Sequence, residues 1–185
     1  LYKDFPTLRA GVATLAKALG SARFEFIGVG DDGPTEHFEN GSIRFVPHVD
    51  REQLVNYYQA ADLYVHAARA DNFPNTILEA LCCGTPVVAT AVGGISEQVR
   101  SFEGFDSGLK TDTFAVERAT GILVPAADSE RLGRAAASLL SNPDILRRFR
   151  SNAAADAAAR FDIDLQSDRY MGLYDQMLSK RALAS

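Results

Sequence analysis

The sequence predicts an α/β fold in which helices flank a parallel sheet, followed by C-terminal helices. Short, continuous apolar runs recur along the chain, and helical segments of ten or more residues separate most of them. Strands joined by such helices form right-handed βαβ units and therefore a parallel sheet. Because polar residues do not interrupt the apolar runs, we expect the sheet to be covered on both faces.

The first half of the chain supplies three strands and two helices. Apolar residues at helical spacing define the first helix, which Gly20 ends. The first strand runs into a glycine turn, and Asp50 suits the N-cap of the second helix. In chain order, we expect a helix over 5–19, strands over 23–30 and 43–46, a helix over 51–60 and a strand over 63–66.

The second half continues the alternation and then becomes helical. Pro125 stops the last strand, Asp128 or Ser129 caps the next helix, and Pro143 begins another. Residues 101–119 are polar and weakly periodic, so we expect a surface insertion there. In chain order, we expect a helix over 76–83, a strand over 87–89, a short helix over 96–100, a strand over 121–124, and helices over 129–140, 143–160 and 165–178.

The composition indicates one globular domain. The chain has 185 residues, of which 46% are hydrophobic, so disorder is excluded and a sizeable core is expected. The formal net charge of −5 argues against a general nucleic-acid binder, and no apolar run is long enough for a membrane span. The adjacent residues Cys82 and Cys83 argue against an extracellular disulfide framework. We expect them to be small buried residues at a helix end of a cytoplasmic protein.

The start of the sequence is unusual for a chain of alternating strands and helices. Residues 1–6 lead directly into a helix, with no strand before it and no signal peptide. We therefore expect residues 1–185 to be a piece of a longer protein.

Residues 71–90 carry the strongest functional signal. Asp71 and Glu79 bracket a turn and the start of a helix, and a Gly-Thr-Pro break and a buried strand follow. A helix N-terminus offers backbone N–H groups that bind anions, and carboxylates accept hydrogen bonds from sugar hydroxyls. This pattern predicts a site for a phosphorylated sugar, most simply a nucleotide-sugar.

Several segments together resemble the GT4 family of retaining glycosyltransferases. Seven residues separate Asp71 from Glu79, as in that family's acidic pair, and the segments 60–65, 79–89, 93–97 and 120–125 are similar to family segments in the same order. The resemblance implies the GT-B architecture, in which two Rossmann-like domains enclose the active site. Residues 1–185 would then be the C-terminal, nucleotide-sugar-binding domain, without its first strand and without the N-terminal acceptor domain.

The resemblance implies a role for each acid, and we take both as catalytic candidates. Glu79 would accept hydrogen bonds from the donor ribose, and Asp71 would face the transferred sugar. The family usually has glutamate at the latter position, and aspartate is one methylene shorter. Taken alone, Glu79 is also consistent with a solvated glutamate on a helix. Asp71 is also consistent with a turn residue whose side chain hydrogen-bonds to its own backbone.

The predicted turn and helix start consist of Asn72, Phe73, Pro74, Asn75 and Thr76. In the family, this stretch donates backbone N–H groups to the sugar and the diphosphate, so all five are binding candidates. Pro74 has no N–H group, which leaves Asn75 and Thr76 as the expected donors. Asn75 also suits a simple N-cap, and the two roles are compatible.

Three further binding candidates lie elsewhere in the chain. Lys3 resembles the family lysine that neutralises the donor diphosphate, and the alternative is an exposed lysine beside a helix start. Gly30 follows the first strand, where a glycine can simply permit a positive φ. Val49 stands where the family holds the nucleotide base through backbone groups. We expect Gly93 and Gly94 to shape the loop beneath the site.

We expect no metal and no cofactor besides the donor substrate, a UDP- or GDP-sugar. His37, His48 and His66 lack the spacing of metal ligands, and His66 suits a packed imidazole. The glycines near residue 30 are too few for a dinucleotide fingerprint. The resemblance implies that helix dipoles and cations stabilise the leaving diphosphate.

The functional hypothesis is the donor half of an enzyme that transfers a hexose, with retention, to an acceptor hydroxyl. We expect residues 1–185 alone to be inactive, to need the N-terminal domain as partner, and to self-associate through apolar residues left uncovered near the cleft or on the last helices. The absent domain would allow a membrane-peripheral location. A non-catalytic nucleotide-binding or assembly module with a decayed site is the alternative, which Asp71 and Pro74 favour. The acid spacing disfavours a sugar-nucleotide epimerase.

Overall fold

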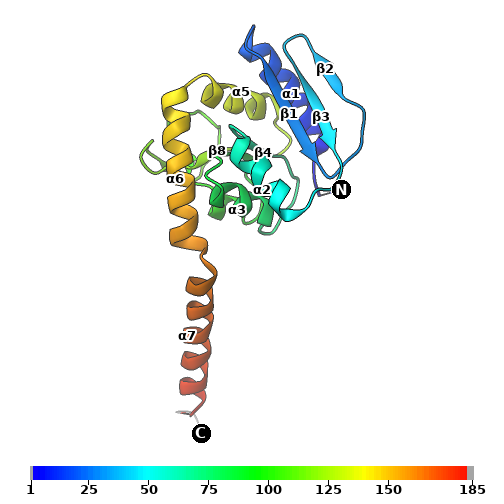
Figure 1. The fold of residues 1–185 in the computed structure, drawn as a ribbon. Coiled ribbons are helices and arrows are strands. Elements are labelled where there is room, and N and C mark those ends of the chain that lie inside the picture. Colours follow the sequence, from blue (N-terminus) through cyan, green and yellow to red (C-terminus); the bar gives the residue numbers. More distant parts are fainter. Residues whose placement is uncertain (1, 183–185) are drawn as a thin grey trace.

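The computed structural model describes residues 2–182 and confirms the predicted α/β architecture (Figure 1). The helices are α1 (Phe5–Leu19), α2 (Arg51–Ala60), α3 (Asn75–Cys82), α4 (Ile95–Gln98), α5 (Ser129–Leu140), α6 (Pro143–Phe161) and α7 (Ile163–Ala182). The strands are β1 (Phe24–Val29), β2 (Glu36–Phe38), β3 (Gly41–Val46), β4 (Tyr64–His66), β5 (Val87–Thr90), β6 (Ser101–Phe102), β7 (Thr113–Phe114) and β8 (Gly121–Val124).

Helix caps explain why several helices have the bounds that the sequence predicts. The Asp50 carboxylate accepts a hydrogen bond from the Gln53 N–H at 2.8 Å and begins α2. Asp128 does the same for α5, through the Arg131 N–H at 2.9 Å. Each cap satisfies an N–H group that has no acceptor within its own helix.

The strands form two sheets, whereas we expected one parallel sheet. Five parallel strands have the order β4-β5-β8-β6-β7, and a separate sheet has the order β1-β3-β2. In the smaller sheet, β1 and β3 are parallel and the unpredicted β2 is antiparallel to β3. Within residues 2–182, β1 and β4 each pair with a strand on one side only.

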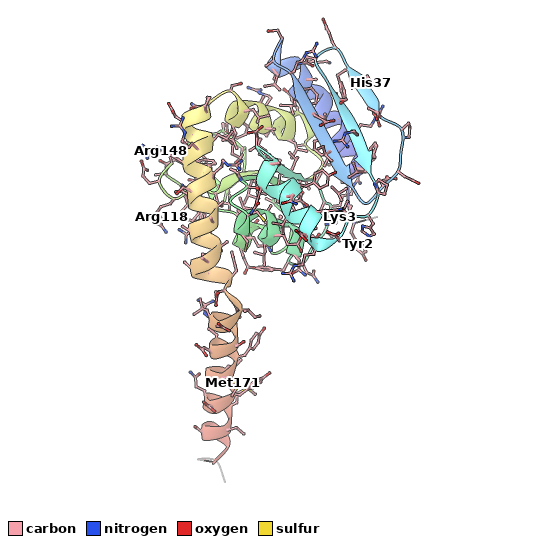
Figure 2. The ribbon with its side chains drawn as sticks, in the orientation of Figure 1. Tyr2, Lys3, His37, Arg118, Arg148 and Met171 are labelled. Carbon is pink, nitrogen blue, oxygen red and sulfur yellow. The ribbon has the colours of Figure 1, made fainter. Side chains whose placement is uncertain are left out.

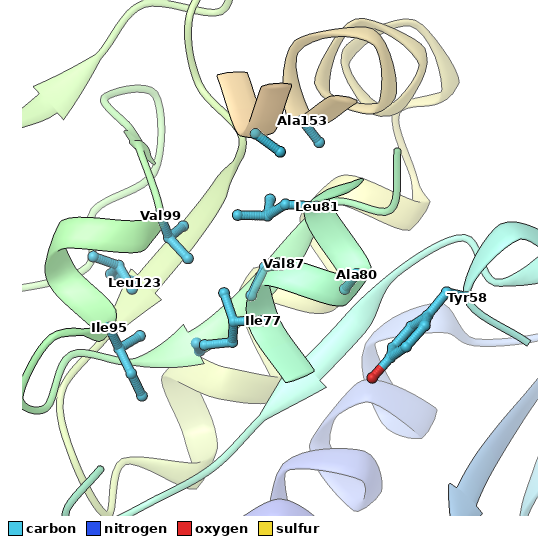
Figure 3. Packing of buried hydrophobic residues seen from close by; sticks show 11 residues of the cluster. Tyr58, Ile77, Ala80, Leu81, Val87, Ile95, Val99, Leu123 and Ala153 are labelled. Atoms are coloured by element: carbon cyan, nitrogen blue, oxygen red, sulfur yellow. The ribbon is translucent and has the colours of Figure 1, made fainter. Parts of the chain in front are cut away.

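Helices cover both faces of the five-stranded sheet, as predicted. Successive side chains of a strand point to opposite faces, so Val87 and Leu123 join one hydrophobic cluster while Val88 and Ile122 join another. The first cluster contains the buried residues Ile77, Ala80 and Leu81 of α3 and Ile95 of α4 (Figure 3). The second contains Leu132, Ala135 and Leu139 of α5 and Phe149 of α6.

Residues 101–119 are not wholly the surface insertion that we expected. Residues 101–102 form β6 and residues 113–114 form β7, and both strands join the larger sheet. The Phe102 ring packs edge-on against Phe149 of α6, with centroids 5.3 Å apart. Strands of two residues carry no detectable periodicity, so this contact with the core was not predictable from pattern.

The C-terminal helix α7 extends away from the body of the domain (Figure 1). Met171 projects from it and is 60% exposed (Figure 2). Other exposed apolar residues on α7 are Ile163, Tyr170, Leu173, Tyr174, Met177 and Leu178. This is the uncovered apolar surface that we expected on the last helices, and self-association through it stays a prediction. None of the helices within residues 2–182 is long and apolar enough to cross a membrane.

The expectation that both cysteines are buried is wrong. Cys82 is exposed and Cys83 is half-buried. Leu81 occupies the inward position at the end of α3 and is fully buried. Ile77, Ala80 and Leu81 together define the buried side of α3, and at about 100° per residue Cys82 lies on the opposite side.

Candidate functional site

The turn that carries the functional signal joins β4 to α3. Pro74 is the N-cap residue of α3, and no side chain caps the helix. Asn75 lies one position inside the helix, so the alternative that it serves as the N-cap is wrong. The first N–H groups of a helix have no acceptor within it. Among the described residues, the N–H groups of Asn75 and Thr76 have no side-chain or loop acceptor, which leaves them available to an anion.

Two glycines lie directly beneath this turn. The N–H of Gly94 donates to the carbonyl oxygen of Asn72 at 2.7 Å. A Cβ atom at Gly94 would overlap with that oxygen, and one at Gly93 would overlap with the carbonyl oxygen of Asp71. Gly93 also has a positive φ of 51°. The prediction that this pair shapes the loop beneath the site is therefore confirmed.

Gln98 supports the turn from within the core. Its side chain is fully buried, and its Nε2 donates to the carbonyl oxygen of Pro74 at 3.1 Å. The sequence shows no periodic or motif signal for this contact, because it joins residues on separate elements. Gln98 belongs to α4, which packs beside α3.

At the first end of the turn, Asp71 meets two residues that are distant in the sequence. The Lys3 ammonium donates to Asp71 Oδ2 at 3.0 Å and lies 3.2 Å from Nε2 of His66. The Asp71 carboxylate is mostly shielded, whereas the Lys3 side chain is 60% exposed. Asp71 therefore pairs with a cation rather than bonding its own backbone, and Lys3 is not a solitary surface lysine.

At the other end, Glu79 is the fifth residue of α3 and is exposed. Its Oε2 accepts a hydrogen bond from the hydroxyl of Tyr58 at 3.2 Å. Tyr58 lies at the edge of the cluster in Figure 3 and is largely buried. Burial raises the pKa of Tyr58 above its ordinary value, so the phenol remains a donor at neutral pH. The second oxygen of Glu79 has no side-chain partner within residues 2–182.

An aromatic column connects the two ends beneath the turn. The Tyr64 ring lies between Tyr58 and His66, with centroid separations of 5.6 and 5.9 Å. The Tyr64 hydroxyl is 3.1 Å from Nδ1 of His66. Burial raises the pKa of Tyr64 to about 12. Burial, together with the nearby Lys3 ammonium, lowers the pKa of His66 to about 4, so this imidazole is neutral at pH 7.

The backbone fixes Lys3 beside the end of β4. The Asp4 N–H donates to the Ala67 carbonyl at 3.0 Å, and the Arg69 N–H donates to the Tyr2 carbonyl at 2.9 Å. Figure 2 shows Tyr2 and Lys3 together at the edge of the domain. These bonds bring residues 2–4 to the same edge as the turn that contains Asp71.

Asp4 joins this anchor to helix α1. Its buried carboxylate accepts hydrogen bonds from the Thr7 hydroxyl at 2.8 Å and from Arg69 Nε at 3.0 Å. These bonds, the one from Thr7 above all, hold the pKa of Asp4 below its ordinary value of 3.8. Since the carboxylate form is stabilised in the folded state, its contribution is present above that pH and is lost as the pH falls through the folded value.

We expect Asp4→Ala to lower the free energy of unfolding by about 1 kcal/mol at pH 7, because the α1 cap is lost. Urea unfolding at a series of pH values measures this. The difference from wild type should shrink as the pH falls below 3.8. Asp144→Ala, which removes an exposed acid in the first turn of α6, is the control and should have a smaller effect. A loss of stability that does not depend on pH would contradict this role of Asp4.

The structure does not bring the remaining binding candidates into contact with the acids. Gly30 follows β1 with a φ of +100°, which accounts for the glycine, and Val49 is half-buried after β3. Phe73 points toward the end of α6, where its ring packs edge-on against Phe161 at 5.9 Å. There it lines a pocket of about 610 Å³ together with Arg160 and Tyr170.

Sequence reasoning missed Tyr58 and Gln98 and took His66 for a packed imidazole. His66 is indeed buried, but both its ring nitrogens have polar partners. The one signal in the sequence was a histidine at the end of an apolar strand, five residues before Asp71. Within the described part of the chain, no three His, Cys, Asp or Glu residues gather as metal ligands would.

Comparison with known sequences matches this chain to glycosyltransferases. The family model described as glycosyl transferases group 1 matches residues 34–156. A D-inositol 3-phosphate glycosyltransferase of Saccharomonospora viridis is 31% identical over 136 residues, which are 74% of this chain and 28% of that relative. One of Mycobacterium avium is 33% identical over 132 residues, 71% of this chain and 27% of that relative. The chain thus spans less than a third of these relatives.

Comparison with solved structures confirms the fold. Sucrose-phosphate synthase from Thermosynechococcus elongatus matches with a TM-score of 0.65 and 26% identity, over 94% of this chain and 43% of its own. Anabaena HepE, solved in complex with UDP-glucose, matches with a TM-score of 0.64 and 22% identity, over 90% of this chain and 45% of its own. The second likeness bears on the fold alone.

Proposed function

Because this chain belongs to the glycosyl transferases group 1 family, we propose that it is the nucleotide-sugar-binding domain of a retaining hexosyltransferase. The donor is a UDP- or GDP-sugar, and the acceptor is a hydroxyl group bound by the rest of the protein. Neither a resident metal nor a further cofactor is part of the proposal, and the protein acts in the cytoplasm. The names of the curated relatives support the transferase class.

One observation carries the proposal: Asp71 and Glu79 stand at the two ends of a turn in which the N–H groups of Asn75 and Thr76 have no acceptor among residues 2–182. The diphosphate lies against the N–H groups of Asn75 and Thr76, where the dipole of α3 favours negative charge. Lys3 supplies the cation. Glu79 accepts hydrogen bonds from the ribose hydroxyls with the oxygen that Tyr58 leaves free.

Asp71 faces the sugar that is transferred. Charge develops on the leaving diphosphate as the glycosidic bond breaks, and donors already in place stabilise that charge without reorganisation. In the free protein, Lys3 and Asp71 neutralise each other at 3.0 Å. The approach of a diphosphate gives the Lys3 ammonium a second anion to contact.

Titration calorimetry with UDP and GDP tests the proposal on residues 1–185 and on the whole protein. We expect either UDP or GDP to bind to residues 1–185 and also to the whole protein. The affinity of residues 1–185 alone should be micromolar to millimolar. No binding of either nucleotide to the whole protein would contradict the proposal and favour a non-catalytic assembly module with a decayed site.

We also expect residues 1–185 to transfer no sugar without the rest of the protein. The acceptor hydroxyl must be held against the donor for the reaction, and the acceptor site lies in the other domain. The transfer of label from a radiolabelled nucleotide-sugar to acceptors in a cell extract measures this activity. Full turnover by residues 1–185 alone would show that the acceptor site is inside this domain.

A further inference from the structure

His66 is the buried polar group of the site to which the proposed function assigns no role. It is the last residue of β4 and is 4% exposed. Its two ring nitrogens have different partners: the Tyr64 hydroxyl lies 3.1 Å from Nδ1, and the Lys3 ammonium lies 3.2 Å from Nε2. Lys3 is 63 residues away in the sequence.

The partners determine which nitrogen carries the proton. A lysine ammonium has three donors and no acceptor, so Nε2 facing it must accept. A neutral imidazole then carries its proton on Nδ1 and donates it to the Tyr64 oxygen. Asp71 Oδ2 lies 3.6 Å from Nε2, too far for a hydrogen bond, so the imidazole forms its hydrogen bond with Lys3 rather than with Asp71.

This arrangement gives Lys3 two fixed acceptors, Asp71 and His66, and its third N–H has no partner among residues 2–182. An exposed ion pair by itself orients a lysine poorly, because the side chain has many rotamers and water screens the charges. A buried acceptor with a fixed ring plane adds a second point of attachment. The two bonds together hold the ammonium at the edge of the turn that offers free amides.

We propose that His66 is a positioning residue, which holds the Lys3 ammonium ready to bind the diphosphate of the donor. The proposal rests on the proposed function. His66 performs this role only as the neutral imidazole, since a protonated ring would repel Lys3 and pair with Asp71. The ionisable groups that face the ring are Lys3 before α1, Tyr64 on β4 and Asp71 in the turn before α3.

Affinity measurements on two variants of the whole protein test the role. His66→Leu removes the acceptor and should weaken binding of UDP and of pyrophosphate roughly tenfold or more, as the loss of a hydrogen bond to a charged group does. His66→Gln places an amide oxygen near the position of Nε2 and should bind within about threefold of wild type. His37→Gln, which changes an exposed residue of β2, is the control and should bind as wild type does.

The affinities separate two kinds of failure. Unchanged pyrophosphate affinity in a folded His66→Leu protein would overturn the positioning role and leave the proposed function intact. Failure of wild type to bind UDP, GDP or pyrophosphate would overturn both. If His66→Leu and His66→Gln lost the same amount of pyrophosphate affinity, that result would also contradict the role of His66 as an acceptor.

Nitrogen NMR of the His66 ring in the wild-type protein tests the geometry without relying on a variant that must fold. At pH 7 we expect the tautomer with the proton on Nδ1. Lys3→Met should raise the pKa of His66, because it removes a cation, and Asp71→Asn should lower it, because it removes an anion. A proton on Nε2, or no change in Lys3→Met, would overturn the proposal.

Discussion

Replacing Glu79 with glutamine is expected to weaken UDP binding by roughly tenfold to a hundredfold. A carboxylate accepts hydrogen bonds from two neighbouring hydroxyls, and a hydrogen bond to a charged group contributes about 1.5–3 kcal/mol. Glutamine keeps the shape of the side chain but loses the charge and one acceptor. Titration calorimetry with the whole protein measures the change in affinity.

Pyrophosphate distinguishes the ribose contact from a general loss of the site. It has no ribose, so Glu79→Gln should bind it as wild type does, while Lys3→Met should bind both ligands more weakly. Glu52→Gln, an exposed acid in the first turn of α2, is the matched control for the change in net charge. Unaltered UDP affinity in Glu79→Gln would remove this acid from the donor site.

The second large effect concerns the glycine pair beneath the turn. Gly94→Ala forces a methyl group against the carbonyl oxygen of Asn72 and should destabilise the protein by about 1–3 kcal/mol, as overpacking does. Gly93→Ala adds a positive φ to a similar clash and should cost roughly 2–5 kcal/mol. Both should also weaken UDP binding, because the turn must shift. Urea unfolding and calorimetry measure the two effects.

Two other glycines distinguish the cost of a positive φ from the cost of a close contact. Gly20 has a positive φ of 60° but open space around it, so Gly20→Ala should cost about 1–3 kcal/mol through backbone strain alone and leave UDP affinity unchanged. Gly172 in α7 has neither constraint, and Gly172→Ala should be neutral or stabilise by up to about 1 kcal/mol. If Gly94→Ala behaves like Gly172→Ala, the close contact beneath the turn does not exist.

The parts of the fold that depend on local signals were predictable from the sequence. Helix α1 has the expected bounds because apolar spacing and a terminal glycine mark it. The starts of α2 and α5 were predictable because the N-cap residues Asp50 and Asp128 mark them. The strands β6 and β7 were missed because each has only two residues, and pairing within the larger sheet, not their own pattern, determines them. The three-residue β2 was also missed, although it pairs with the adjacent strand β3.

The same division applies to the candidate site. The acid pair and the turn between them lie within nine consecutive residues, so their spacing is visible in the sequence. The contacts that orient the acids are not, since Tyr58 precedes Glu79 by 21 residues and Lys3 precedes Asp71 by 68. Only the fold brings these residues together. The orientation of the Phe73 ring toward Phe161, away from the acids, likewise depends on where α6 ends.

The most direct measurement is an amide NMR titration of the domain with UDP-sugar and GDP-sugar. If the turn between the two acids is the donor site, the signals of Asn75 and Thr76 should shift first and saturate with the ligand, together with those of Lys3 and Asp71. Shifts confined to another surface, such as the pocket lined by Phe73, Arg160 and Tyr170, would contradict that assignment.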